Sequence, residues 1–441
     1  MTKLISPSIA RPVQLVLLTM AAAAGSYSRT TMGPLQEVIR ESLALNDTQV
    51  ALLQGVALAV PMALIAVPLG LLIDRYVRVR LICLLVIVSL LGTLLTAFAP
   101  GFAGLFLARC LVGLTAFSIP SVAVSLIADL FAPAQRGRAT MVMALGQMGG
   151  VSGAFALGGL LSGGSTTDPM HWRWELVQMS APFLLVICTL PALREPPRTE
   201  LAVKNTSTRQ ALSELWSYRG VVIPLLSGVV IEQIAAGAAL VWAPPTLSRN
   251  FKIPPDQVGA IMAAVVMVSG LTGSFLGGFL ADQCQRRGGA RRTMLALSGL
   301  ALLGIPAALF GVMPEVPLAS LLLGVQSSEG MLIAIMATAL STVVIPNELR
   351  GLCTTILSAA SLLVGLAFAP ISVSMISSSI GGPSKIGVAL AIVGSVTSVF
   401  GAIAFALGAR HLARIGERHA VDESQDAVAE MFDNWSGGRN S

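Results

Sequence analysis

Four charged side chains lie inside long apolar stretches, where a charge is costly and points to a function: Arg29, Arg109, Glu232 and Glu329. An arginine in a wet cavity can hold a carboxylate or phosphate through two parallel hydrogen bonds. A carboxyl group in a membrane interior can take up and release a proton during transport. These residue types predict transport without a catalytic residue. We expect substrate binding by Arg29, Glu232 and Glu329, and proton coupling through Arg109, Glu232 and Glu329.

Each of the four residues also has a purely structural interpretation. Arg29 can anchor the chain at the outer headgroups, and Arg109 can extend its side chain to the outer interface. Either glutamate can serve only as a hydrogen-bond partner for a neighbouring helix, or bind a cationic part of the substrate. Because Arg29 has no acidic residue beside it in the sequence, we expect it to bind an anionic or zwitterionic substrate.

The elements that carry these residues follow from the composition. Of the 441 residues, 54% are hydrophobic and 11% are charged, with a mean hydropathy of +0.80, whereas soluble domains have about 25% charged residues. A membrane-spanning helix needs about 20 apolar residues. The sequence predicts an all-α membrane protein with twelve transmembrane helices, at residues 12–32, 49–73, 81–99, 103–128, 140–163, 174–193, 220–244, 257–280, 293–312, 317–344, 353–378 and 386–409.

The placement of the remaining charges predicts how the chain crosses the membrane. Most of the 28 Lys and Arg residues fall in loops after even-numbered spans or in the two tails. Since basic residues stay on the cytoplasmic side, we expect both termini inside, in a multi-pass protein of the inner (plasma) membrane. The net charge of +6 is explained by this topology and does not indicate nucleic-acid binding. Trp172, Trp174 and Trp242 fall near predicted outer ends, as interfacial aromatic residues do.

The two halves of the chain contain related segments. Gly-Leu-Leu-Ile-Asp-Arg ends the second span at Arg75, and Gly-Phe-Leu-Ala-Asp ends the eighth at Asp282. Pro133 to Gly137 opens the fifth span, and the similar segment Pro346 to Gly351 opens the eleventh. We therefore expect two pseudo-symmetric six-helix bundles that face a central cavity, where secondary transporters bind substrate. The predicted parts are an N-terminal bundle 1–193, a cytoplasmic linker 194–219, a C-terminal bundle 220–409 and a cytoplasmic tail 410–441.

The stretch from Gly70 to Arg80 resembles the hallmark loop of the major facilitator superfamily, and the segment ending at Asp282 resembles its repeat. In that family the loop latches the two halves on the cytoplasmic side in the outward-open state. Arg109, four residues after Leu105, resembles a second family motif, whose arginine is linked to proton coupling. The alternative is that the loop arginines serve only topology and lipid headgroups. The resemblance implies the major facilitator fold and a cytoplasmic gate formed by Asp74, Arg75, Arg78 and Asp129, with Asp282 as their counterpart.

The N-terminal half is most similar to the spinster-like or organic-anion branch of this superfamily, which includes transporters of lysolipids and related amphiphiles. The branch has an acidic residue just before the first-span arginine, where this chain has Ser28, and a fourth-span glutamate, where Thr115-Ala-Phe117 has none. Those carboxyls are the branch's proposed proton carriers, so we expect Glu232 or Glu329 to have taken over coupling. The segments that carry the similarity are Ser26–Arg29, Leu45–Gln49, Ser125–Phe131 and Trp242–Pro244.

Small residues recur every four positions in the fifth and eighth spans. Such stripes let two helices approach closely. In the fold that the chain resembles, these spans face each other between the halves, so we expect the two stripes to pack together there. The residues are Gly146, Gly150, Ala154 and Gly158, and Gly270, Ser274 and Gly278.

The sequence leaves three functions open. The first is a symporter that moves a small organic anion with protons by alternating access. The second is an exporter or flippase of amphiphiles, lysolipids or drugs, and the third is a membrane sensor that has lost transport. The sequence has no Gly-x-x-x-x-Gly-Lys-[Ser/Thr] loop, so we do not expect an ATP-driven pump. The Cys and His residues have no ligand spacing, so we expect no metal site, and a transporter needs neither an enzyme activity nor a cofactor. We expect a monomer in the lipid bilayer whose partners are the small-molecule substrate and protons.

Overall fold

The computed structural model describes residues 11–163, 170–197 and 208–437, and every regular element in these ranges is a helix. Residues 198–207 of the predicted linker lie outside them. The helices of the first half are α1 Arg11–Thr30, α2 Gln36–Ser42, α3 Asp47–Gln54, α4 Val56–Arg75, α5 Arg78–Phe98, α6 Phe102–Leu130, α7 Pro133–Ser162, α8 His171–Gln178 and α9 Ala181–Thr189. Those of the second half are α10 Thr208–Ser217, α11 Arg219–Phe251, α12 Pro255–Ala307, α13 Val316–Val344, α14 Asn347–Leu362, α15 Ala369–Ser379 and α16 Ile386–Gly437.

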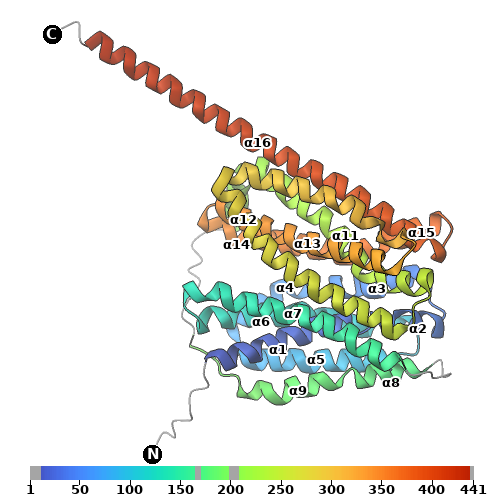
Figure 1. Cartoon of the computed structure of the whole chain (residues 1–441). Helices are drawn as coiled ribbons and strands as arrows, with labels where there is room; N and C mark the ends of the chain where they lie inside the picture. Colours follow the sequence, from blue (N-terminus) through green and yellow to red (C-terminus); the bar gives the residue numbers. More distant parts are fainter. Residues whose placement is uncertain (1–10, 164–169, 198–207, 438–441) are drawn as a thin grey trace, which may run out of the picture.

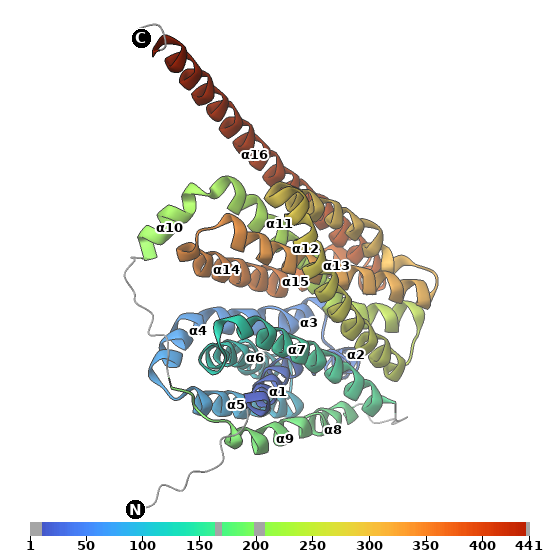
Figure 2. The same ribbon diagram turned by 60° about the vertical axis from the view of Figure 1, so that its left-hand side comes forward.

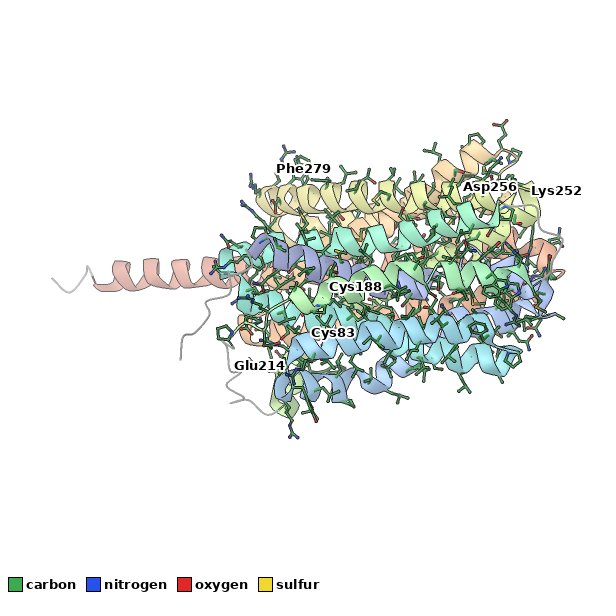
Figure 3. The ribbon with its side chains drawn as sticks, turned by 90° about the horizontal axis from the view of Figure 1, so that it is seen from below. Cys83, Cys188, Glu214, Lys252, Asp256 and Phe279 are labelled. Carbon is green, nitrogen blue, oxygen red and sulfur yellow. The ribbon has the colours of Figure 1, made fainter. Side chains whose placement is uncertain are left out.

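The helices stack in two layers, with α1–α9 in one and α11–α16 in the other (Figure 1). The turned view shows α3, α4 and α7 on the side of the first layer that faces the second (Figure 2). Glu214 of α10 lies at one end of the molecule, and Lys252 and Asp256 lie at the other (Figure 3). We call these the α10 end and the α2/α3 end. Helix α16 continues well past its predicted end at 409 and leaves the body at the α10 end (Figure 1).

The predicted fold class is confirmed. Among the described residues, ten stretches are long and apolar enough to cross a membrane. One of them, Pro255–Val312, consists of two helices that meet at Gly288 and Gly289, where the backbone leaves helical geometry. Gly289 has a φ of 60°, in the left-handed region that favours glycine. Separating these two helices and adding the 20-residue α1 gives the twelve that the sequence predicts.

The internal repeat appears as the same hydrogen bond in both halves. Arg136, in the first turns of α7, donates from Nε to the carbonyl of Phe131 at 3.2 Å. Arg350, in the first turns of α14, donates from Nε to the carbonyl of Ile345 at 2.9 Å. Each bond spans five residues and satisfies a carbonyl at the preceding helix end, which supports the two related halves.

The glycine stripe of α7 packs inside its own half, so the prediction that it meets the stripe of α12 was wrong. Gly146 and Gly150 face Thr19 and Ala23 of α1. Helices α7 and α12 do face each other, as expected. Of the two stripes, Gly270 of α12 takes part in this contact, packed against Met148 of α7. The backbones also touch at Gly159 and Gly259, and Ser152 donates to the carbonyl of Ala263 at 2.8 Å.

The packing of α7 gives a matched pair of glycine variants. A methyl group at Gly150 would collide with the backbone of Ala23, whereas nothing lies within 4 Å of one at Gly153. We expect Gly150→Ala to destabilise the protein by about 1–3 kcal/mol through overpacking, and Gly153→Ala to stabilise it by up to about 1 kcal/mol through helix propensity. Thermal unfolding of the purified variants in detergent measures both. Shifts of the same sign in both variants would contradict the close α1–α7 contact.

The other contacts between the layers gather toward the α2/α3 end. Thr48 at the start of α3 and Ser374 of α15 share a hydrogen bond of 3.0 Å between their hydroxyls. Gly55, where α3 ends and α4 begins, has no room for a side chain because the carbonyl of Leu366 in the opposite layer faces it. The two halves are therefore closely packed at this end.

Candidate functional site

Arg29 lies in the last turn of α1 and has no anionic partner among the described residues. Its guanidinium carbon lies 5.4 Å from the ring centroid of Phe117 on α6, in the segment where the spinster-like branch has a glutamate. Its Nε is buried without a hydrogen-bond partner, and the ion pairs of the described residues do not include it. A cation–π contact leaves the donors of the guanidinium free for a ligand.

The surroundings of Arg29 are two pockets between the layers. The first combines residues of both halves: Arg29, Thr30, Gly33, Gln54, Leu58, Phe155, Leu240, Val241 and Leu366. The second is an open space of about 700 Å³ lined by Arg29, Met148, Val151, Gln233, Ala236, Leu240, Val266, Ser269, Gly270, Ser327, Gly330, Met331 and Ala334. Arg29 and Leu240 line both pockets. Small-molecule sites are typically apolar clefts with a few convergent polar groups, and Arg29 is the charged residue of these two pockets.

Arg109 of α6 lies directly behind Arg29. It is fully buried, so the alternative of a side chain extended to the membrane interface is wrong. It donates to the carbonyl of Arg29 at 2.6 Å, to the Gln54 side chain at 3.1 Å and to the carbonyls of Leu53 and Ser28 at 3.5 Å. These acceptors belong to the ends of α1 and α3. The guanidinium groups of Arg29 and Arg109 lie close enough to interact electrostatically. Because the ion pairs of the described residues include neither arginine, the positive charge at this place is uncompensated there.

Glu232 and Glu329 are not among the residues that line this pocket. They are 2% and 5% exposed, and the pocket is lined instead by the adjacent residues Gln233 and Gly330. Neither oxygen of Glu232, nor Oε1 of Glu329, has a hydrogen-bond partner within residues 11–163, 170–197 and 208–437. The structural alternative, a hydrogen bond from Glu232 to a neighbouring helix, is therefore not observed. Substrate contact and proton coupling by these two residues stay predictions.

Two of the residues predicted to form a cytoplasmic gate, Arg78 and Asp129, are paired within the first half. Arg78 forms ion pairs with Asp129 at 2.5 Å and with Glu195, which follows α9, at 2.8 Å. The sequence prediction missed Glu195, although it is an acidic residue just after the sixth span. Arg75 and Asp282 are exposed, and the side chain of Asp74 lies outside the part that the structure describes.

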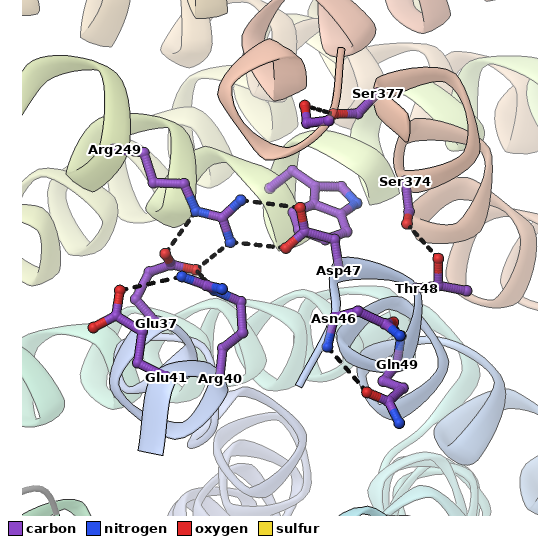
Figure 4. Close-up of polar contacts among 12 residues, drawn as sticks. Glu37, Arg40, Glu41, Asn46, Asp47, Thr48, Gln49, Arg249, Ser374 and Ser377 are labelled. Carbon is purple, nitrogen blue, oxygen red and sulfur yellow. Dashed lines mark hydrogen bonds and ion pairs between the residues drawn. The ribbon is translucent and has the colours of Figure 1, made fainter. Parts of the chain in front are cut away.

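A second ion network, missed from the sequence, joins the layers at the α2/α3 end (Figure 4). Arg249 of α11 binds Glu37 of α2 through Nε and Nη2, both at 2.6 Å, and binds Asp47 of α3 through Nη2 at 2.9 Å and Nη1 at 3.1 Å. We call this the Arg249 latch. The predicted seventh span ended at 244, before Pro245, but α11 continues to Phe251. The sequence did contain a signal: Arg249, Glu37 and Asp47 fall in two loops that were both predicted on the outer side of the membrane.

Comparison with known proteins gives a family match over most of the chain. The family model described as Major Facilitator Superfamily matches residues 16–370. A probable 4-methylmuconolactone transporter of Cupriavidus pinatubonensis is 29% identical over 263 residues, which cover 58% of this chain and 58% of the relative. Protein spinster homolog 1 of Xenopus tropicalis is 28% identical over 269 residues, which cover 56% of this chain and 50% of the relative. The matches thus span about half the length of these relatives.

Solved structures show the same fold. A bacterial homologue of the human lysosomal transporter spinster, solved in an inward-facing and unoccupied conformation, superposes with a TM-score of 0.79 at 21% identity. The alignment covers 93% of this chain and 99% of that one. The nucleoside transporter NupG superposes with a TM-score of 0.69 at 13% identity. At these identities the similarity establishes the fold alone.

Proposed function

This chain belongs to the Major Facilitator Superfamily, and we propose that it is a secondary active transporter that moves a small organic anion by alternating access. The observation that carries the proposal is Arg29, a guanidinium without an ion-pair partner among the described residues, in pockets lined by both halves. Uncompensated positive charge at the end of a cleft attracts anions, and a free guanidinium binds a carboxylate through two hydrogen bonds. The 4-methylmuconolactone relative points in the same direction.

The arrangement of contacts supports a rocking mechanism. Close packing and the Arg249 latch join the halves at the α2/α3 end, whereas the Arg78 network stays inside one half. In the proposed cycle, the α2/α3 end faces outward and is closed here, and the α10 end faces the cytoplasm with both termini. Substrate then exchanges between Arg29 and the cytoplasmic side. We propose a monomer in the inner membrane, with proton symport as the source of energy.

Export of amphiphiles is the second candidate. The observation that favours it is an apolar pocket between α1, α7 and α9, lined by Met20, Ala23, Ala24, Tyr27, Gly149, Gly150, Pro182, Phe183, Leu185 and Val186. Leu185 in its wall is 62% exposed, so this pocket opens on the side of the first layer and not between the layers. The spinster relatives give this candidate its weight. A lipid in this pocket would not need Arg29.

Uptake by proteoliposomes tests the proposal. We expect purified protein to take up members of a panel of labelled small carboxylates, 4-methylmuconolactone among the probes. Arg29→Ala should raise the substrate concentration for half-maximal uptake by at least about 30-fold, because truncating one partner of a buried charge pair costs about 2 kcal/mol or more. Arg29→Lys keeps the charge but cannot form the two parallel hydrogen bonds, so its half-saturation concentration should lie between those of the wild type and Arg29→Ala.

An exposed arginine outside the pockets provides the control for this experiment. Arg80→Ala removes an exposed arginine at the start of α5 and should leave uptake unchanged. Wild-type uptake of anions by Arg29→Ala would overturn the assignment of the site. Transport of fluorescent lysolipid that is indifferent to Arg29, without uptake of any anion, would favour the second candidate.

A further inference from the structure

A polar cluster is enclosed within the second half, apart from the pocket at Arg29. Glu232 of α11, Glu329 and Gln326 of α13, and Ser398 of α16 are each at most 5% exposed. Five of their oxygen atoms have no hydrogen-bond partner in the described part of the chain: both carboxylate oxygens of Glu232, Oε1 of Glu329, Oε1 of Gln326 and Oγ of Ser398. Buried polar groups are normally hydrogen-bonded, so such a concentration of unsatisfied acceptors requires an explanation.

These groups are directed toward one another. A side-chain carbon at Gly304 would meet both the hydroxyl of Ser398 and Oε2 of Glu329, the latter at 3.3 Å. One at Gly401, a turn after Ser398, would collide with the carboxylate of Glu232. Glu232 and Glu329 lie within electrostatic reach of each other, and Gln326 shares a helix face with Glu329 because they are three residues apart. Glycines on α12 and α16 therefore make room for the two carboxyls.

The charged groups around the pair are distant. Four helices enclose it: α11, α13, the second part of α12 and α16. Their other described titratable residues lie toward the helix ends, about 12 Å or more along the axes from the facing positions: Arg219 and Arg249 on α11, Arg291 and Arg292 on α12, and Arg410, His411 and Arg414 on α16. The ion pairs of the described residues do not include Glu232 or Glu329. Two carboxylates in such surroundings cannot both stay ionised without a cation between them.

We propose that Glu232 and Glu329, with Ser398 and Gln326 beside them, bind the coupling proton of the transport cycle at a site separate from the substrate pocket. A proton fits better than a metal cation, because the glycine contacts leave the carboxyls closely packed and a proton needs no coordination sphere. Gln233 and Gly330 line the substrate pocket next to the two glutamates. Helices α11 and α13 thus connect the proton site to the substrate. This inference rests on the proposed function, whose transport cycle it deepens.

The neutral variants Glu232→Gln and Glu329→Gln imitate the protonated pair permanently. With one proton per monovalent anion, a gradient of one pH unit is worth about 1.4 kcal/mol and drives about tenfold accumulation in wild-type proteoliposomes. Both variants should lose accumulation, so that the inside and outside concentrations become equal. They should still exchange internal unlabelled anion for external labelled anion at equal pH, because the loaded, protonated carrier can reorient. Glu315→Gln, at an exposed glutamate just before α13, is the matched control and should accumulate like wild type.

A second measurement does not depend on a substrate. The infrared spectrum of the purified wild type should contain the carbonyl band of a protonated carboxyl at neutral pH, and this band should disappear in the double variant Glu232→Gln/Glu329→Gln, which has no carboxyl left at the site. Accumulation by both variants at the wild-type level, a wild type without that band, or accumulation driven by a Na⁺ gradient instead of a pH gradient would each overturn the proton site. Failure of the proposed function gives another result: the band is present, but no anion is exchanged by any form.

Discussion

Arg249→Ala is expected to release the α2/α3 end of the protein and to shift its resting population toward the state in which that end is open. Arg249 is the cation of the latch that links α11 to α2 and α3, and its side chain is only 14% exposed. The two carboxylates that it binds, Glu37 and Asp47, are 17% and 7% exposed. Removing the cation leaves two partly buried anions of the first half without the charge from the second half that binds them.

The size of this effect follows from the burial. Breaking a buried ion pair by removing one partner costs about 3–5 kcal/mol, and 1.4 kcal/mol corresponds to a tenfold change in an equilibrium. The Arg249 latch is partly exposed, so we expect the lower end of that range, which still changes the ratio of the two states about 100-fold. Arg249→Lys keeps the charge but cannot bind both carboxylates in the same geometry, and should give an intermediate shift.

Labelling of Ser374→Cys reports the opening. Ser374 is fully buried beside Thr48 between the layers, so a thiol there should react with a maleimide only when the layers separate. The experiment requires a background without Cys83, Cys110, Cys188, Cys284 and Cys353. Arg40→Ala is the matched control, because Arg40 also binds Glu37 but belongs to the same helix and does not cross the interface. Equal labelling rates in Arg249→Ala and in the background protein would show that the latch does not hold this end closed.

The twelve helices and the two related halves could be predicted because the membrane imposes a length and a composition on each span. The first and last residues of the spans could be predicted less well. The seventh span was predicted to end at 244, but Pro244 and Pro245 are buried within a helix that reaches Phe251. In a helix that is apolar on all sides, proline can be tolerated through contacts with its neighbours. This error of two turns concealed Arg249, which is the cation of the latch.

The direction in which a residue faces was less predictable than its membrane depth. A helix in a membrane is apolar around its whole circumference, so the hydrophobic pattern does not indicate which face meets a cavity. All three were predicted to bind substrate; Arg29 lines the pockets between the layers, whereas Glu232 and Glu329 lie next to the lining residues and not among them. Trp172 and Trp242 were predicted at the interface. Both are fully buried, with their indole N–H groups donating to Ser42 and to the Pro370 carbonyl.

Arg109→Ala is expected to destabilise the protein strongly. The guanidinium of Arg109 is fully buried and donates to three backbone carbonyls and the side chain of Gln54. Those carbonyls belong to the ends of α1 and α3, where the helices leave acceptors unsatisfied and no water is available in the membrane interior. Hydrogen bonds to a charged donor are each worth about 1.5–3 kcal/mol, so a total loss of several kcal/mol is expected. The loss would also free the turn of α1 that presents Arg29.

Thermal unfolding in detergent and anion exchange at equal pH separate the two roles open to Arg109. A positioning role predicts a lower unfolding temperature together with weaker exchange, and partial recovery of both in Arg109→Lys, which retains a donor for the Arg29 carbonyl. Arg80→Ala, at an exposed site, should change neither quantity. If instead Arg109→Ala unfolded at the wild-type temperature, exchanged anion normally and lost only accumulation driven by a pH gradient, Arg109 would act in proton coupling, as its motif implies, and not in support of Arg29.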